Sequence, residues 1–171
     1  MRHNLERSIE EVLRHEGGWS DHPADPGGAT NMGVTLRTYR KYKRNPHLTP
    51  EDLKNLTLEE VHDIYKIGYW DPIKADELPS GVDFVVFDMA INAGPGRAVK
   101  LLQEVVGTRA DGVVGPITLR AVDEYSPERV VTDYTNARED YYRLLPHFST
   151  FGRGWLRRTR ESETIALTML G

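Results

Sequence analysis

The sequence lacks cysteine, and this absence excludes a disulfide scaffold and any metal site built on thiolates. It also lacks a basic excess: the net charge is −4, so we expect no nucleic-acid partner. No run of residues approaches the roughly 18 apolar residues of a membrane helix, and the polar first residues do not resemble a signal peptide. We therefore expect a chain that is made in the cytoplasm, without a signal peptide or a membrane anchor.

Strand patterns are scarce, whereas apolar residues recur at helical spacing along most of the 171 residues. We therefore expect an all-α or α-dominated fold, with room for one small hairpin within residues 17–34 whose turn would be the DPGG sequence. Even the β-prone segment FVVF (84–87) lies inside a longer helical pattern. Helices are predicted at residues 3–16, from the cap Thr35 to Lys43, after the capping box of Thr57 and Glu60, over 82–90, through Leu101 to Val106, after Pro116, and over 127–145 and 153–169.

The segment HEGGWSDHPADPGGATNMGVT (15–35) points most directly to chemistry. Glu16 stands on the last turn of a predicted helix, where the negative end of the helix dipole disfavours a carboxylate anion. Trp19 follows three residues later and could lay an apolar ring against the carboxyl group. Both effects raise the pKa of a carboxyl group and keep it protonated near neutral pH, as a general acid for glycosidic cleavage requires. The alternative is a solvated glutamate at a helix end.

Asp25 is the second carboxylate of this segment, nine residues after Glu16. A loop that folds back can bring it to face Glu16 across a cleft, and two carboxylates that flank the scissile bond are the usual equipment of a glycosidase. Asp25 could equally cap the turn of its own DPGG sequence. Thr30 could orient a water molecule on the same face, or hydrogen-bond the loop backbone. The histidines show no ligand spacing such as HExxH, so we expect no metal site.

Two further pairs of residues are candidates for substrate contacts. Tyr69 and Trp70 stand at a predicted loop edge, where aromatic rings either stack on sugars or pack in a core. Asp88 and Asn92 are four residues apart and therefore share one face of an otherwise apolar helix. Because buried polar groups need partners, these two either brace the active-site loop or line the cleft.

The order of EGGW, DPGG and MGVT resembles the signature of the phage-type N-acetylmuramidases of glycoside hydrolase family 108. The catalytic glutamate of that family begins an EGGY-like motif, and Glu16 holds that position here, with Trp19 in place of the tyrosine. The spacing of Glu16, Asp25 and Thr30 is also similar to the catalytic triad of phage lysozymes of another family, in which the threonine stands about one residue further along. The likeness continues over residues 69–103.

The C-terminal part resembles a binding region rather than an enzyme. Residues 101–119, LLQEVVGTRADGVVGPITL, are similar to the LQ, DG, GP and T pattern of helical peptidoglycan-binding modules. The resemblance implies a lysozyme-like fold with a muramidase domain at 1–95 and a helical peptidoglycan-binding region at 96–171 packed on it.

The resemblance also implies an activity, namely cleavage of the glycosidic bond between N-acetylmuramic acid and N-acetylglucosamine in peptidoglycan. It implies an endolysin-like, bacteriolytic monomer that needs no cofactor and reaches the cell wall through a holin or a secretion system. Two alternatives are a lytic transglycosylase and a non-catalytic wall-binding component of a phage or secretion apparatus. The candidate catalytic residues are Glu16, Asp25 and Thr30, and the candidate substrate-binding residues are Trp19, Tyr69, Trp70, Asp88 and Asn92.

Overall fold

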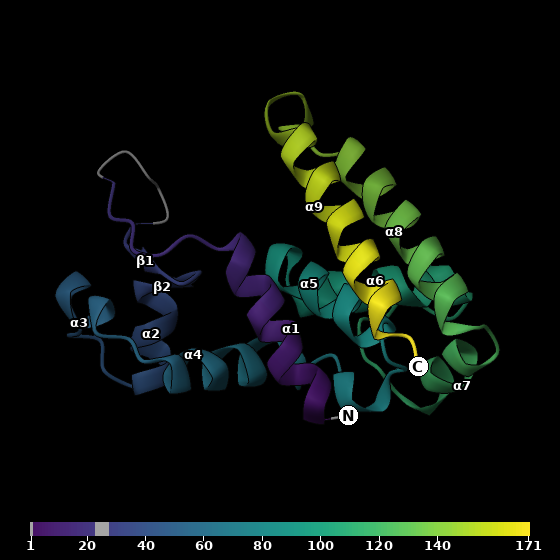
Figure 1. Cartoon of the computed structure of the whole chain (residues 1–171), viewed down its shortest axis with the longest axis horizontal. Coiled ribbons are helices and arrows are strands. Elements are labelled where there is room, and N and C mark those ends of the chain that lie inside the picture. The colour runs from purple at the N-terminus through teal and green to yellow at the C-terminus, as the bar shows by residue number, and fades with distance from the viewer. Residues whose placement is uncertain (1, 23–27) are drawn as a thin grey trace. The chain divides into compact units, whose positions relative to one another are not determined.

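The computed structural model of the chain describes residues 2–22 and 28–171 (Figure 1). Helices dominate these two ranges, as the sequence predicts, and none of the helices there is long and apolar enough to cross a membrane. The helices are α1 (Arg2–His15), α2 (Leu36–Lys43), α3 (Pro50–Lys54), α4 (Leu58–Tyr65), the π-helix η1 (Lys66–Trp70), the 3-10 helix η2 (Ala75–Glu77), α5 (Val82–Ala93), α6 (Pro95–Val106), α7 (Pro116–Asp123), α8 (Pro127–Arg143) and α9 (Phe148–Met169).

The chain divides into two compact units. The first comprises residues 5–68, and the second comprises residues 69–171 together with the start of α1. Within the second unit α5 packs against α6, α8 and α9. The domain boundary that the sequence suggests near residue 95 therefore lies between two helices of one compact unit.

The only sheet in the described residues is a hairpin of β1 (Thr30–Asn31) and β2 (Val34–Thr35). Thr30 pairs with Thr35 and Asn31 pairs with Val34 in antiparallel register. The two turn residues, Met32 and Gly33, have φ values of +49° and +77°, as a two-residue hairpin turn with the right twist requires. The turn of this hairpin is therefore Met32-Gly33. The expected DPGG turn, with Asp25, lies for the most part outside the described residues.

Local capping fixes the helices that surround this hairpin. The Thr35 side chain accepts a hydrogen bond from the Thr38 amide at 3.1 Å and begins α2, and the predicted capping box of Thr57 and Glu60 begins α4. Glu60 also links α4 to α2, because its carboxylate forms an ion pair with the Lys43 ammonium at 2.5 Å. Burial alone would raise the pKa of Glu60, but the Lys43 contact and the Thr57 amide hold it below its usual value.

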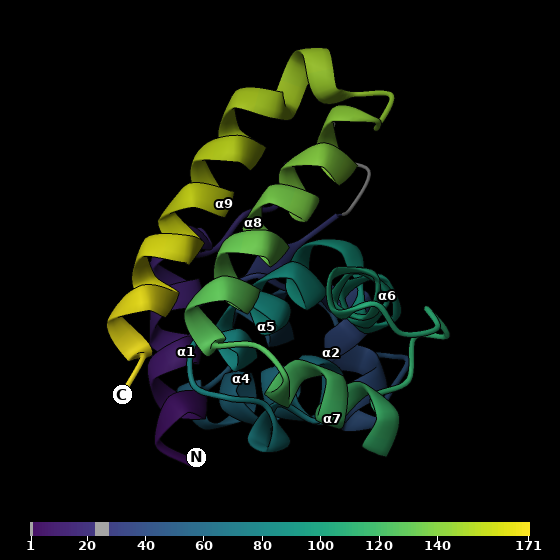
Figure 2. The same ribbon diagram turned by 90° about the vertical axis from the view of Figure 1, so that its right-hand side faces the viewer.

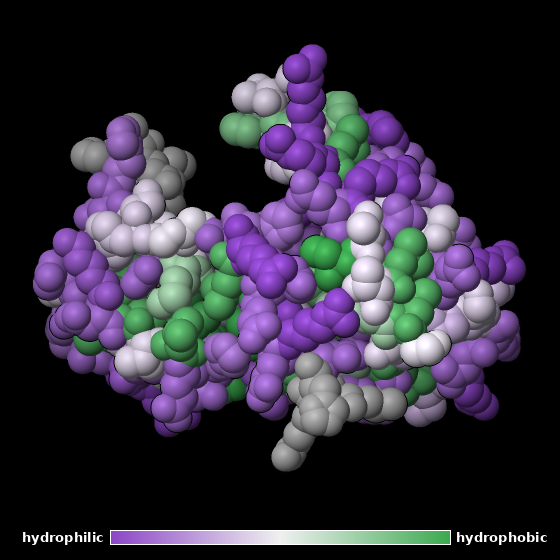
Figure 3. Space-filling model, in the orientation of Figure 1, coloured by the Kyte–Doolittle hydropathy of each residue, from purple (hydrophilic) through white to green (hydrophobic). Residues whose placement is uncertain are grey.

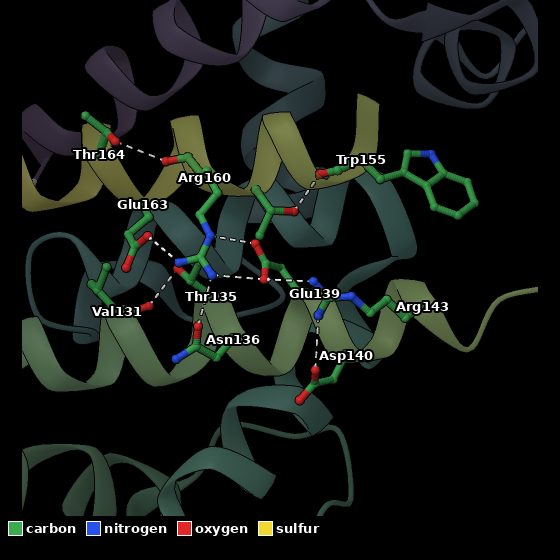
Figure 4. A network of polar contacts seen from close by, with 11 residues as sticks. Val131, Thr135, Asn136, Glu139, Asp140, Arg143, Trp155, Arg160, Glu163 and Thr164 are labelled. Carbon is green, nitrogen blue, oxygen red and sulfur yellow. Dashed lines mark hydrogen bonds and ion pairs between the residues drawn. The ribbon is translucent and has the colours of Figure 1, made fainter. Parts of the chain in front are cut away.

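The second unit is built around α5, which is buried at every position from Val82 to Ala90. A helix that is apolar all round needs cover on all sides, and α6, α8 and α9 supply it here. Helices α8 and α9 lie side by side in both views of the ribbon (Figures 1 and 2). Ion pairs join them on their polar side, where Arg160 contacts Glu139 of α8 at 2.6 Å (Figure 4).

Candidate active site

Glu16 lies directly after the last residue of α1. Its amide still donates to the Val12 carbonyl at 3.1 Å, so the helix fixes its backbone, and its side chain is half-buried. Ile9 and Val12 form the apolar face of α1, and both are fully buried. The negative end of the helix dipole is therefore at the position that the sequence predicts for the acid.

The hairpin turn lies against the Glu16 side chain. A Cβ atom on Gly33 would lie 3.0 Å from Cγ and 3.2 Å from Cδ of Glu16, and it would overlap the hydroxyl oxygen of Tyr65. The φ of Gly33 is +77°, which side chains other than glycine rarely adopt. Both the backbone conformation and the space around it therefore require glycine here. Because Gly33 has no side chain, the Glu16 carboxyl group and the Tyr65 hydroxyl can both approach the turn.

Two side chains hold the turn in place. The Tyr65 hydroxyl donates a hydrogen bond to the Met32 carbonyl at 3.0 Å, and its residue is only 1% exposed. The Asn31 amide donates to the Leu53 carbonyl at 3.0 Å and so anchors β1 to α3. Met32 is half-buried and Gly33 is exposed, so these two hydrogen bonds anchor a turn that reaches the surface, as a site that meets a polymer substrate requires.

Thr30 lies in the middle of this small sheet. Its backbone exchanges hydrogen bonds with Ser20 at 2.9 and 2.8 Å on one side and pairs with Thr35 on the other. Because the backbone partners are already supplied, its half-buried side chain is not needed to satisfy the strand. Thr30 therefore lies in the same unit as Glu16. Asp25, in the segment between Ser20 and Thr30, is outside the described residues.

Trp19 precedes Ser20 and is 37% exposed. The Lys54 ammonium lies 4.9 Å from its ring centroid, a cation–π contact. One aromatic face thus contacts a cation at the end of α3, while more than a third of the residue stays open to solvent. Exposed aromatic surface of this kind can contact a sugar ring.

Tyr69 and Trp70, expected in a sugar-binding cleft, differ in the structure. Trp70 is 1% exposed, meets Phe87 edge-on at 5.2 Å and donates its indole N–H to Asp76 at 3.0 Å. A ring this deeply buried has no face for a sugar, so Trp70 is a core residue and its expected substrate role is wrong for this structure. Tyr69 is half-buried in η1.

Asp88 is also a core residue. Its carboxylate contacts Arg138 at 2.7 Å and Arg158 at 2.9 Å, and the side chain is 2% exposed. Burial alone would raise the pKa of Asp88, but the two guanidinium groups outweigh it and hold that pKa below its usual value. Asp88 therefore braces α5 against α8 and α9 rather than contacting a substrate. Asn92, one turn later, is exposed and lines a cavity.

Sequence reasoning did not assign Gly33 and Tyr65 to the site. Gly33 had a signal, since a glycine directly before the β-branched pair Val34 and Thr35 indicates a tight turn. Tyr65 had none, because at helical spacing it is indistinguishable from a core aromatic.

Comparison with known proteins defines the class of this chain. The family model described as Glycosyl hydrolase 108 matches residues 9–94, and the model described as Predicted Peptidoglycan domain matches residues 97–160. The chain belongs to the glycosyl hydrolase 108 family, and it is a glycoside hydrolase that acts on peptidoglycan in the cell wall.

A solved structure supports this assignment over the whole length. The structure of Brucella abortus SagA is similar with a TM-score of 0.89 and 41% sequence identity, over 99% of this chain and 97% of that one. The lysozyme-like, α-dominated fold expected from the sequence agrees with it. No curated protein matches the sequence significantly.

Proposed function

We propose that this protein hydrolyses the glycosidic bond between N-acetylmuramic acid and N-acetylglucosamine, with Glu16 as the general acid. The observation that carries the proposal is the packing of Glu16 at the end of α1 against the glycine of a hairpin turn that hydrogen bonds anchor to α3 and Tyr65. A general acid must be held in one orientation toward the oxygen it protonates. The whole arrangement lies within residues 9–94 of this chain, the range that the glycosyl hydrolase 108 model matches.

The reaction needs one proton donor and one stabiliser of positive charge. Glu16 donates its proton to the glycosidic oxygen as the bond from that oxygen to the anomeric carbon breaks, and an oxocarbenium-like centre develops. A water molecule then adds its hydroxyl to that carbon and gives up its second proton to a carboxylate. We assign Asp25 to stabilise the centre or to activate the water, and Thr30 to orient the water. Because proton transfer and charge stabilisation suffice, this chemistry uses no cofactor.

A lytic transglycosylase is the main alternative. In that reaction the 6-hydroxyl of the muramic acid attacks the anomeric carbon and closes a ring, so no water needs a polar anchor. The presence of Asp25 and Thr30 within fifteen residues of Glu16 favours the hydrolase. A non-catalytic wall-binding protein is disfavoured, because it has no use for a carboxyl group held against a glycine turn.

The products of purified peptidoglycan decide between these reactions. We expect fragments that carry one added water and end in reducing N-acetylmuramic acid, as measured by mass spectrometry after borohydride reduction. A digest dominated by 1,6-anhydro products would show a transglycosylase. Fragments that end in reducing N-acetylglucosamine would show that the other bond of the strand is cut.

A further inference from the structure

A small cavity lies in the second unit, at the ends of three helices. It has a volume of about 180 Å³ and is lined by Asn92, Ala93, Tyr141, Tyr142, Leu145 and Trp155. Asn92 and Ala93 end α5, the two tyrosines end α8, and Trp155 belongs to α9. Both family regions therefore contribute to one cavity: the hydrolase region supplies Asn92 and the peptidoglycan region supplies the aromatic rings.

The aromatic rings form a continuous row. Tyr141 lies 5.7 Å from Tyr142, which lies 5.4 Å from Trp155, and Phe151 lies 5.9 Å beyond Trp155. Phe151 is 55% exposed, although folded chains usually bury a side chain of this size. Figure 3 shows apolar residues (green) at the surface near the free end of the α8–α9 pair. The row thus runs from the cavity toward solvent.

The buried pair of Arg138 and Asp88 fixes the position of Tyr142, one of the residues that line the cavity. The Tyr142 hydroxyl accepts a hydrogen bond from Arg138 Nε at 3.0 Å and contacts the Met89 sulfur at 3.4 Å. Arg138 is in turn held by Asp88. In Figure 4 the Trp155 indole extends away from the polar contacts that join α8 and α9, so its ring is not used by that network. A fixed aromatic floor costs little ordering entropy when a ligand binds.

Asn92 supplies the polar group. Its side chain is exposed, and among the described residues it has no hydrogen-bond partner. An amide offers two N–H donors and one oxygen acceptor. None of the six lining residues is charged, so the cavity suits a neutral ligand with an apolar face and hydrogen-bonding edges. Sites that bury a drug-sized ligand measure roughly 300–1,000 Å³, so this smaller cavity takes a single ring with its substituent.

We infer that this cavity binds one N-acetylhexosamine unit of the glycan strand, with the sugar against the half-buried Trp155 and its polar edge on Asn92. The inference rests on the proposed function, because that function supplies a glycan substrate. The cavity contributes affinity and not chemistry. Its six lining residues carry no charge, and the Arg97 guanidinium, 5.5 Å from the Tyr141 ring, is engaged in a cation–π contact, so the cavity favours the neutral sugar over the charged stem peptide.

Binding is best measured without cleavage, in the Glu16→Gln background, by isothermal titration with two probes. One probe is an oligomer of N-acetylglucosamine, and the other is glycan strands freed of stem peptides by an amidase. Trp155→Ala should weaken both affinities by about tenfold, as the loss of one stacking ring does. Asn92→Ala should weaken them about threefold, and because Asn92 is exposed its loss should leave the melting temperature unchanged. Trp155→Phe should restore part of the affinity.

Tyr125→Ala is the matched control, an aromatic of the same unit whose ring contacts Arg129 and lies outside the cavity. It should bind both probes normally. Unchanged affinity in a folded Asn92→Ala and in Trp155→Ala would overturn the inference, and so would binding that requires stem peptides. A shift from dimer to monomer in Trp155→Ala by sedimentation, with unchanged affinity, would assign the row to self-association. If the wild-type chain fails to cut peptidoglycan yet binds the oligomers through Trp155, the proposed function fails and the sugar site stands.

Discussion

Removing the charge of Asp88 tests how the second unit is held together. Asp88 and Arg138 are 2% and 1% exposed, and Nη2 of Arg138 has no hydrogen-bond partner among the described residues. Arg138 therefore depends on Asp88 for its compensation. Breaking a buried pair by removing one partner costs about 3–5 kcal/mol of unfolding free energy. Because asparagine keeps one acceptor oxygen, we expect Asp88→Asn to cost about 3 kcal/mol, the lower end of that range.

The loss can be measured by thermal and urea unfolding. For a chain of this size 1 kcal/mol lowers the melting temperature by about 2–4 °C, so Asp88→Asn should melt about 6–12 °C lower. The matched control is Asp140→Asn, which removes an exposed ion pair with Arg143 on α8 and should change the unfolding free energy by less than about 1 kcal/mol. Equal effects of the two substitutions would refute the assignment of Asp88 as a buried brace.

The same cluster predicts the pH dependence of stability. The folded-state pKa of Asp88 is lower than its unfolded-state value of about 3.9, so its contribution is present above that pH and is lost as the pH falls through the folded-state pKa. Wild type should therefore lose stability below about pH 4 more steeply than Asp88→Asn. Parallel stability curves in acid would contradict the lowered pKa.

Three further substitutions test the first unit. Gly33→Ala should cost about 1–3 kcal/mol through its positive φ and should lower lytic activity at least tenfold, because the new methyl group displaces the Glu16 side chain; unchanged melting and lysis would contradict the close packing. Tyr65→Phe should cost about 1–3 kcal/mol by leaving the Met32 carbonyl without its buried donor; an unchanged urea midpoint would show that water replaces the hydroxyl. Asp25→Asn should lower lysis strongly but less than Glu16→Gln does, and normal turbidity clearance would restrict Asp25 to a turn.

Most helices could be predicted because their signals are local. The cap at Thr35 and the box at Thr57 begin helices where expected, since the side chain and the amide it accepts from are three residues apart. Helix α3 was missed although Thr49, Pro50 and Asp52 form the same kind of signal. Helix α9 begins at Phe148, five residues earlier than expected, because its buried Gly152 packs against the Phe148 ring instead of ending a helix.

The aromatic residues show what sequence cannot supply. Trp70 was expected in the sugar-binding cleft and is in the core, whereas Tyr65, to which the sequence assigns no role, reaches the hairpin turn. Their roles depend on Phe87 and Met32, which are 17 and 33 residues away in the chain. Side-chain type and helical spacing do not encode contacts at that separation, so the candidate acid could be named from sequence but the surface around it could not.

The most direct test of the central claim is the lysis of purified walls by Glu16→Gln, followed by turbidity. The substitution keeps the shape of the side chain and removes the acid, so the rate should fall by about 10²–10⁴-fold with the melting temperature unchanged. Glu10→Gln, an exposed glutamate on the same helix, should lyse walls at the wild-type rate. Clearance near the wild-type rate by a folded Glu16→Gln protein would contradict the assignment of Glu16 as the proton donor.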